Sequence, residues 1–141
     1  SGLDLVVAGL NPPRFLISLA DRFPNVRLVA SPDQEAMDRL VRNAHIHLMM
    51  TEQATGMKLK LLQVLFTGRF VIANEAMLYG TGLRNVCTMV KDTKQVVEIS
   101  RMLMDREFTL KEAEERSIKL GSSFANKANA EKLIRFIFRD S

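Results

Sequence analysis

The sequence predicts an α/β fold built on an open parallel sheet, and three observations predict it. Short apolar runs alternate with longer stretches in which apolar residues recur at helical spacing. Glycine, proline and asparagine separate these segments. The regular alternation of strand and helix is typical of βαβ units, in which the strands run parallel. We therefore expect a doubly wound, Rossmann-like sheet with the strand order 3-2-1-4-5.

The first part of the chain is expected to form three strands with a helix between each pair. Phe15, Leu16 and Leu19 recur at helical spacing, which predicts a helix of about 11 residues that ends before Pro24. Ser31-Pro32-Asp33 is typical of a helix start, and the next helix carries Met37, Leu40, Val41 and Ala44 on its apolar face. The three predicted strands are 3–9, 26–30 and 45–50.

A central helix is expected to run from Gly56 to Thr67, with Gly68 ending it and a strand following at 70–73. In this helix Leu59, Leu62 and Phe66 are expected to form one apolar stripe, which Leu61 and Leu65 widen. Further along, we expect a glycine-punctuated loop or short helix at 74–82, a strand at 86–90, a helix capped by Asp92-Thr93, a helix at 109–124 with Thr109 and Glu112 in capping-box spacing, and a helix at 126–138.

Length and composition restrict the classes of function. With 141 residues, the natural expectation is a single domain, 1–141. The net charge of +4 suits an anionic ligand but lacks the strong basic bias of nucleic-acid-binding domains. Cys87 is the only cysteine and sits in an apolar run, which predicts a buried thiol and excludes a disulfide or zinc framework. His45 and His47 alternate on a strand without a third ligand nearby, so no metal site is expected.

Several common catalytic motifs are missing from the sequence. We find no serine nucleophile elbow and no glycine-rich loop of the Gly-Lys-Ser type. Where a dinucleotide-binding fold carries G-x-G-x-x-G after its first strand, residues 9–13 read Gly-Leu-Asn-Pro-Pro. These absences weaken the prediction of a P-loop enzyme or a classical dinucleotide-binding enzyme.

Polar residues gather instead where the strand 45–50 runs into the central helix. Thr51, Glu52, Thr55, Gly56 and Lys58 follow that strand directly. Ligands of open α/β sheets bind beyond the carboxyl ends of the strands, where helix N-termini offer free backbone N–H groups. The sequence therefore predicts an anion-binding site at this end of the sheet.

The order of the motifs resembles the C-terminal, donor-binding half of a GT-B glycosyltransferase of the "glycosyl transferases group 1" type. The strand Leu5-Val6-Val7-Ala8-Gly9 ends in glycine, as the second strand of that half does. Residues 24–28 and 40–48 match its next two strands. The closest match is 60–73, Lys-Leu-Leu-Gln-Val-Leu-Phe-Thr-Gly-Arg-Phe-Val-Ile-Ala, which is similar to the family's helix and following strand.

The resemblance implies a function and a site. It implies transfer of a sugar from a UDP- or GDP-sugar to a glycan or lipid-linked acceptor, as in polysaccharide biosynthesis, in the cytoplasm or at the inner face of the membrane, with no metal or cofactor in this domain. The family's two donor-site glutamates fall at Thr55 and Gln63, where neither residue is acidic. The residues that the resemblance and the strand ends place in the nucleotide-sugar site are Gly9, Asn11, Thr51, Glu52, Thr55, Gly56, Met57, Lys58, Lys60, Leu61 and Gln63.

By the same resemblance, the acceptor domain, the first strand of this half and any catalytic base lie upstream of Ser1, and the isolated domain turns nothing over. Two alternatives remain open from the sequence. The missing glutamates favour a non-catalytic Rossmann-like interaction domain, and a GT-B-like sugar-nucleotide epimerase would share the same site. The sugar, the base, the acceptor and the stereochemistry are not determined by the sequence.

Overall fold

The structure, a computed structural model, describes residues 2–54 and 58–124. The chain forms two compact units, Ser1–Asn43 and Ala44–Ser141. Both units are α/β with a parallel sheet, of two strands in the first and three in the second. The predicted fold class is confirmed at this level, whereas a single domain over 1–141 stays a prediction.

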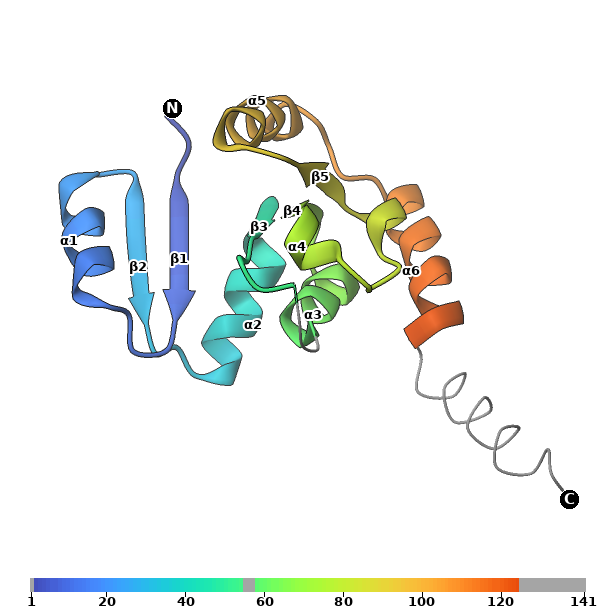
Figure 1. Cartoon of the computed structure of the whole chain (residues 1–141), viewed down its shortest axis with the longest axis horizontal. Helices are drawn as coiled ribbons and strands as arrows, with labels where there is room; N and C mark the ends of the chain where they lie inside the picture. Colours follow the sequence, from blue (N-terminus) through green and yellow to red (C-terminus); the bar gives the residue numbers. More distant parts are fainter. Residues whose placement is uncertain (1, 55–57, 125–141) are drawn as a thin grey trace, which may run out of the picture. The chain divides into compact units, whose positions relative to one another are not determined.

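The first unit is one βαβ unit followed by a helix (Figure 1). Its elements are β1 (Leu5–Gly9), α1 (Arg14–Arg22), β2 (Val26–Ala30) and α2 (Gln34–Asn43). The two strands pair in parallel from Leu5 opposite Val26 to Gly9 opposite Ala30. The helix α1 begins after Pro13, which suits a helix start because proline lacks an N–H that would be unpaired there. The predicted β2 is confirmed to the residue, and α1 spans 9 residues rather than about 11.

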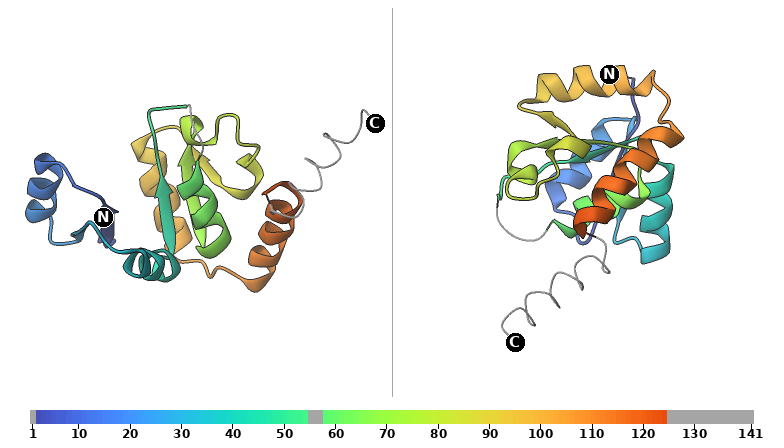
Figure 2. Two further views of the ribbon diagram at one scale, coloured as in Figure 1. Left: turned by 90° about the horizontal axis from the view of Figure 1, so that it is seen from below. Right: turned by 90° about the vertical axis from the view of Figure 1, so that its right-hand side faces the viewer.

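The second unit holds a three-stranded parallel sheet in the order β3-β4-β5. Figure 2 shows α3 and α5 on opposite faces of this sheet. Its elements are β3 (Ile46–Met49), α3 (Leu59–Thr67), β4 (Phe70–Asn74), the short α4 (Glu75–Leu78), a 3-10 turn η1 (Arg84–Val86), β5 (Thr88–Val90), α5 (Thr93–Met104) and α6 (Leu110–Phe124). The expected strand at 86–90 is thus shorter, because its first residues belong to η1 and the bend after it.

The core of the second unit has two sides, because successive side chains of a strand point to opposite faces of the sheet. Phe70 and Ile72 of β4 pack with Val90 and Leu103 on the face that α5 covers. Their neighbours Val71 and Ala73 are also buried, so β4 is covered on both faces. Such a strand reads as a continuous apolar run, which is how 70–73 appears in the sequence.

The predicted strand order is wrong for two pairs of neighbours, the third strand with the second and the first strand with the fourth, because β4 lies between β3 and β5. In the order 3-2-1-4-5 the third strand lies beside the second, but β3 pairs with β4, from Ile46 opposite Phe70 to Met49 opposite Ala73. The predicted neighbours β1–β2 and β4–β5 are both observed. The error arose because strand pairing depends on the position of each strand in the whole sheet, which hydrophobic periodicity does not encode.

The predicted apolar side of the central helix is confirmed for Leu61 and Leu65 and wrong for Leu59 and Phe66. The buried side of α3 consists of Leu61, Val64 and Leu65, whereas Leu59 is 61% exposed and Phe66 is 50% exposed. The helix is apolar around most of its circumference, so periodicity alone could not show which side meets the sheet. Its described part begins at Leu59, with Lys58 at the N-cap, and it ends at Gly68 as predicted.

The predicted caps of the last two helices are confirmed. The Asp92 carboxylate accepts a hydrogen bond from the N–H of Gln95 at 2.8 Å, which caps α5. At the start of α6, the N–H of Thr109 donates to Glu112 Oε2 at 3.0 Å and the N–H of Glu112 donates to Thr109 Oγ1 at 3.3 Å. These two bonds form the capping box that the spacing predicted.

The predicted helix at 126–138 lies outside the described residues. Within 2–54 and 58–124, no helix has both the length and the apolar character needed to cross a membrane.

Candidate functional site

The carboxyl ends of β3 and β4 are tied together by the side-chain amide of Asn74. Asn74 Nδ2 donates to the carbonyl of Thr51 at 2.7 Å, and Asn74 Oδ1 accepts from the N–H of Thr51 at 3.2 Å. The same oxygen accepts from the N–H of Met77 at 3.2 Å and so caps α4. Asn74 therefore fixes where the chain leaves β3. Sequence reasoning did not select Asn74, although an asparagine between a strand and a helical segment is a typical N-cap.

The loop after β3 is held by its own polar groups. Thr51 Oγ1 accepts from the N–H of Gln53 at 3.1 Å, a short turn closed by a side-chain hydroxyl. Lys58 Nζ donates to the carbonyl of Gln53 at 2.8 Å. We expected Lys58 in the first turn of the helix, either facing an external anion or as a solvated charge. It lies at the N-cap instead, and its ammonium group closes the loop.

The N-terminus of α3 adjoins this loop. The first helical hydrogen bond runs from the N–H of Leu62 to the carbonyl of Lys58 at 3.1 Å. The N–H groups of residues 59–61 therefore have no acceptor within the helix, and the positive end of the helix dipole lies here. The start of α3 therefore offers backbone N–H donors to an anion.

The remaining predicted residues of this unit differ in their surroundings. Glu52 and Lys60 are exposed, and Gln63 is half-buried in the second turn of α3. Leu61 is fully buried, so its side chain belongs to the core and only its backbone N–H can serve a ligand. Thr55, Gly56 and Met57 lie outside the described residues.

Gly9 and Asn11 belong to the first unit, so the predicted site is divided between the two units. They form part of the carboxyl edge of the β1–β2 sheet. The carbonyl of Gly9 accepts from the N–H of Ser31 at 2.7 Å, and the N–H of Asn11 donates to Ser31 Oγ at 3.4 Å. Asn11 and Ser31 both adopt positive φ, at 46° and 49°, which asparagine tolerates better than most residues.

The carboxyl edge of the second unit offers groups that can bind a polar ligand. Among residues 2–54 and 58–124, no three histidine, cysteine, aspartate or glutamate side chains gather as a metal site would require. The groups at the carboxyl edge of the second unit include amides, hydroxyls, backbone N–H groups, the Glu52 carboxylate and the ammonium groups of Lys58 and Lys60. The donors among them suit a phosphate or a sugar hydroxyl.

Sequence reasoning also missed a cluster at the opposite, amino end of the β3-β4-β5 sheet. There Arg106 and Arg116 lie over the rings of Phe70 and Phe108, each at 4.9 Å from the ring centre. These residues come from β4, α6 and the segment between α5 and α6, and no motif connects them in the sequence. Only the folded chain brings them together.

In comparisons with known proteins, no family model, no curated protein and no solved structure matches the chain.

Proposed function

We propose that this chain is the donor-binding part of a nucleotide-sugar-dependent glycosyltransferase with a doubly wound, GT-B-type C-terminal half. The observation that carries the proposal is the pattern of strand pairing. The resemblance makes β1 to β5 the second to sixth strands of a sheet with the order 3-2-1-4-5-6. In that order the neighbours among them are β1–β2, β3–β4 and β4–β5, which are the three observed pairs.

The same numbering accounts for the pairs that are absent. Among the described residues, β1 pairs with β2 alone and β3 pairs with β4 alone, which leaves each at the edge of its sheet. Apart from His47 of β3, both strands are apolar, and they lack the lysines, prolines and bulges that usually protect an edge. We infer that each of these edges is a place where a further parallel strand could pair.

The proposed donor site uses the carboxyl edge. The diphosphate of a UDP- or GDP-sugar would accept hydrogen bonds from the N–H groups of residues 59–61, where the dipole of α3 also favours an anion. The Gln63 amide would bond a ribose hydroxyl, and Thr55 a sugar hydroxyl, in place of the family's two glutamates. Lys60 is exposed near the start of the helix and would add charge without a fixed contact.

In this proposal the domain stabilises the leaving nucleotide diphosphate, which is where electrostatic catalysis contributes to glycosyl transfer. The acceptor, a glycan or a lipid-linked sugar, would be bound by an N-terminal domain, and reaction would follow closure of the two domains. The isolated chain should bind donor weakly and catalyse nothing.

The test is an NMR titration of the chain with UDP, GDP and their sugars. We expect shifts in the amides of residues 58–63 at millimolar ligand, with one base preferred. The Gln63→Leu variant should bind more weakly, whereas Gln95→Leu, at the start of α5, should bind as the parent does. If ligands leave these amides unmoved in a longer protein that includes the upstream strand, the proposal is wrong.

One observation favours a second function, a non-catalytic interaction domain. Both family glutamates are replaced, by Thr55 and Gln63, so the charge that contacts donor sugar and ribose is gone. This alternative is supported if the full-length protein, supplied with donor and acceptor, shows neither sugar transfer nor donor hydrolysis. It is excluded if the full-length protein transfers sugar.

A further inference from the structure

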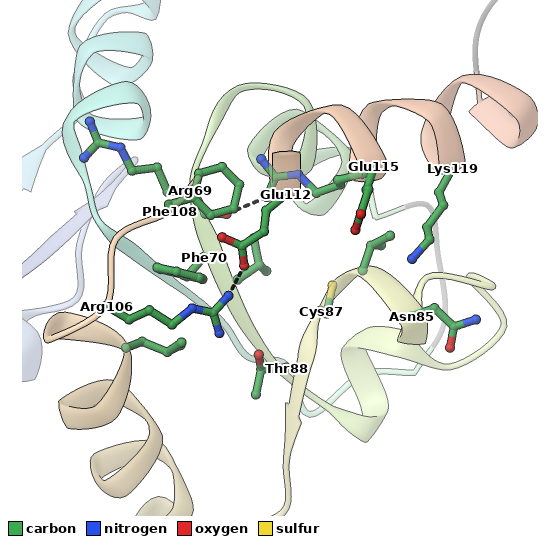
Figure 3. Close-up of a pocket in the computed structure, with 14 residues that line it drawn as sticks. Arg69, Phe70, Asn85, Cys87, Thr88, Arg106, Phe108, Glu112, Glu115 and Lys119 are labelled. Atoms are coloured by element: carbon green, nitrogen blue, oxygen red, sulfur yellow. Dashed lines mark hydrogen bonds and ion pairs between the residues drawn. The ribbon is translucent and has the colours of Figure 1, made fainter. Parts of the chain in front are cut away.

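The second unit contains a cavity at the amino end of its sheet, away from the proposed donor site. Its volume is ≈ 230 Å³. It lies between α6 and the segment 85–88 that leads into β5, with the start of β4 below (Figure 3). Its polar lining consists of Arg69, Asn85, Cys87, Thr88, Arg106, Glu112, Glu115, Arg116 and Lys119.

Arg116 is the most constrained cation of this lining. Its Nη1 donates to the carbonyl of Arg69 at 2.5 Å, and its Nη2 donates to the carbonyl of Gly68. Its guanidinium lies over the ring of Phe108. A guanidinium has five N–H donors in a fixed plane, so three remain after these two bonds. Arg116 is thus held rigidly by the end of α3, with donors to spare.

The charges around the cavity do not balance. Arg106 is neutralised by an ion pair with Glu112. That leaves Arg69, Arg116 and Lys119 against Glu115, whose Oε1 lies 4.0 Å from Lys111 Nζ in an exposed ion pair, and no described carboxylate forms an ion pair with Arg116. Burial lowers the pKa of Arg116, which means that the fold holds this cation partly out of water at a cost. An anion in the cavity would offset that cost.

We propose that this cavity is a binding site for a small phosphate, held by the free donors of Arg116 and by the ammonium of Lys119. Figure 3 shows Lys119 and Glu115 extending from α6 toward the side where Cys87 and Asn85 lie. Phosphate oxygens match the planar fork of a guanidinium and accept from lysine as a point charge. The volume is below the usual range for drug-sized ligands, which suits a phosphate rather than a nucleotide.

Glu115 makes the site selective. A carboxylate beside two cations repels a fully ionised anion but accepts a hydrogen bond from one that keeps a proton. Hydrogen phosphate carries a P–OH group near neutral pH, and sulfate does not. The site should therefore prefer hydrogen phosphate to sulfate, and the Glu115→Gln variant should lose that preference.

The single cysteine gives a direct measurement, because Cys87 lines the cavity. We would measure the rate at which N-ethylmaleimide modifies Cys87 in the presence of inorganic phosphate, glycerol phosphate, sulfate or acetate, each at the same ionic strength. At a phosphate concentration about ten times Kd, labelling should slow by roughly tenfold, since the occupied fraction is protected. Protection by inorganic phosphate alone, or by the glycerol ester as well, would distinguish a free ion from a phosphate monoester.

The Lys119→Gln variant should need several-fold more phosphate for the same protection, and Lys94→Gln, an exposed lysine of α5 outside the cavity, should behave as the parent. We substitute Lys119 rather than Arg116 because the hydrogen bonds of Arg116 to the carbonyls of Gly68 and Arg69 also support the fold. Circular dichroism would confirm that each variant is folded. The proposal is overturned if phosphate gives no protection, if sulfate protects equally, or if Lys119→Gln changes nothing. It stands or fails independently of donor binding, which involves the other end of the sheet.

Discussion

The two units of this chain begin with the same arrangement, strand, helix and parallel strand, but they differ in what they bury. In the second unit β4 is buried along Phe70–Ala73, and Leu61 and Leu65 of α3 are almost completely enclosed. In the first unit α1 has no buried residue, Phe15 is 70% exposed and β1 is exposed at its start. Both sheets have regular parallel pairing, so backbone hydrogen bonding alone does not distinguish them.

The difference shows what a parallel sheet needs. Such sheets are stable when both faces are covered, and a lone pair of strands is at best marginally stable in water. The second unit meets this condition with α3 on one face and α5 on the other. The first unit has one crossover helix and few buried side chains, so by itself it does not meet this condition.

The largest test of this comparison is amide hydrogen exchange. We expect the amides of Val71, Ile72 and Ala73 to exchange only through global unfolding of the second unit. Those of Val6 to Ala8 should exchange through local opening, faster by orders of magnitude. Equal protection in β1 and β4, measured by NMR at neutral pH, would show that the first unit has a stable core of its own.

The next largest effect concerns the two sides of α3. Leu61→Ala should lower the free energy of unfolding by about 2–5 kcal/mol, because it leaves a cavity in the closed core. Leu59→Ala, on the exposed side of the same helix, should change it by no more than about 0.5 kcal/mol. Chemical denaturation measures both. Similar losses for the two variants would mean that the exposed side of α3 is covered in solution.

A smaller loss is expected at Gly68, where the chain turns from α3 into β4. A Cβ there would lie 2.5 Å from His47 Nε2 and 2.8 Å from the carbonyl oxygen of Val64. Gly68→Ala should therefore cost about 1–3 kcal/mol, as overpacking does. Gly121→Ala is the matched control, since a Cβ in α6 meets no described atom within 4 Å and should add about 0.5–1 kcal/mol. Thermal unfolding would separate the two variants clearly.

Local sequence patterns predicted most elements of both units, because strands, caps and turns depend on residues near one another. Val26–Ala30, Asp92 and the Thr109–Glu112 pair are confirmed for that reason. The pairing of β3 with β4, the buried side of α3 and the Arg116 cavity depend on residues far apart in the chain. Periodicity carries no information on such contacts. The role of Lys58 was missed because a lysine at a helix start gives no sign of whether it bonds a ligand or its own loop.

The smallest predicted effect is a dependence of stability on pH. It reports on the second unit alone, because Cys87, the only cysteine, belongs to that unit. Burial raises the pKa of the Cys87 thiol to about 11, and the nearby Arg116 partly opposes this. An unfolded cysteine ionises near pH 8.5, so between these values the folded state binds more protons than the unfolded state. Stability of the second unit should therefore be complete below about pH 8.5 and decline as the pH rises toward 11.

The ordinary pKa values of lysine and tyrosine side chains also lie in this range. The contribution of Cys87 is therefore the difference between the parent and Cys87→Ala in how steeply stability falls with pH. Unfolding followed by a probe of the second unit should decline less steeply with pH in Cys87→Ala than in the parent. In Arg116→Gln, the loss of the cation should raise the thiol pKa further, which slows Cys87 alkylation at pH 9. If the free energy of unfolding depends on pH equally in the parent and in Cys87→Ala, the thiol is not buried, and the second unit is as open to water at this position as the first unit is.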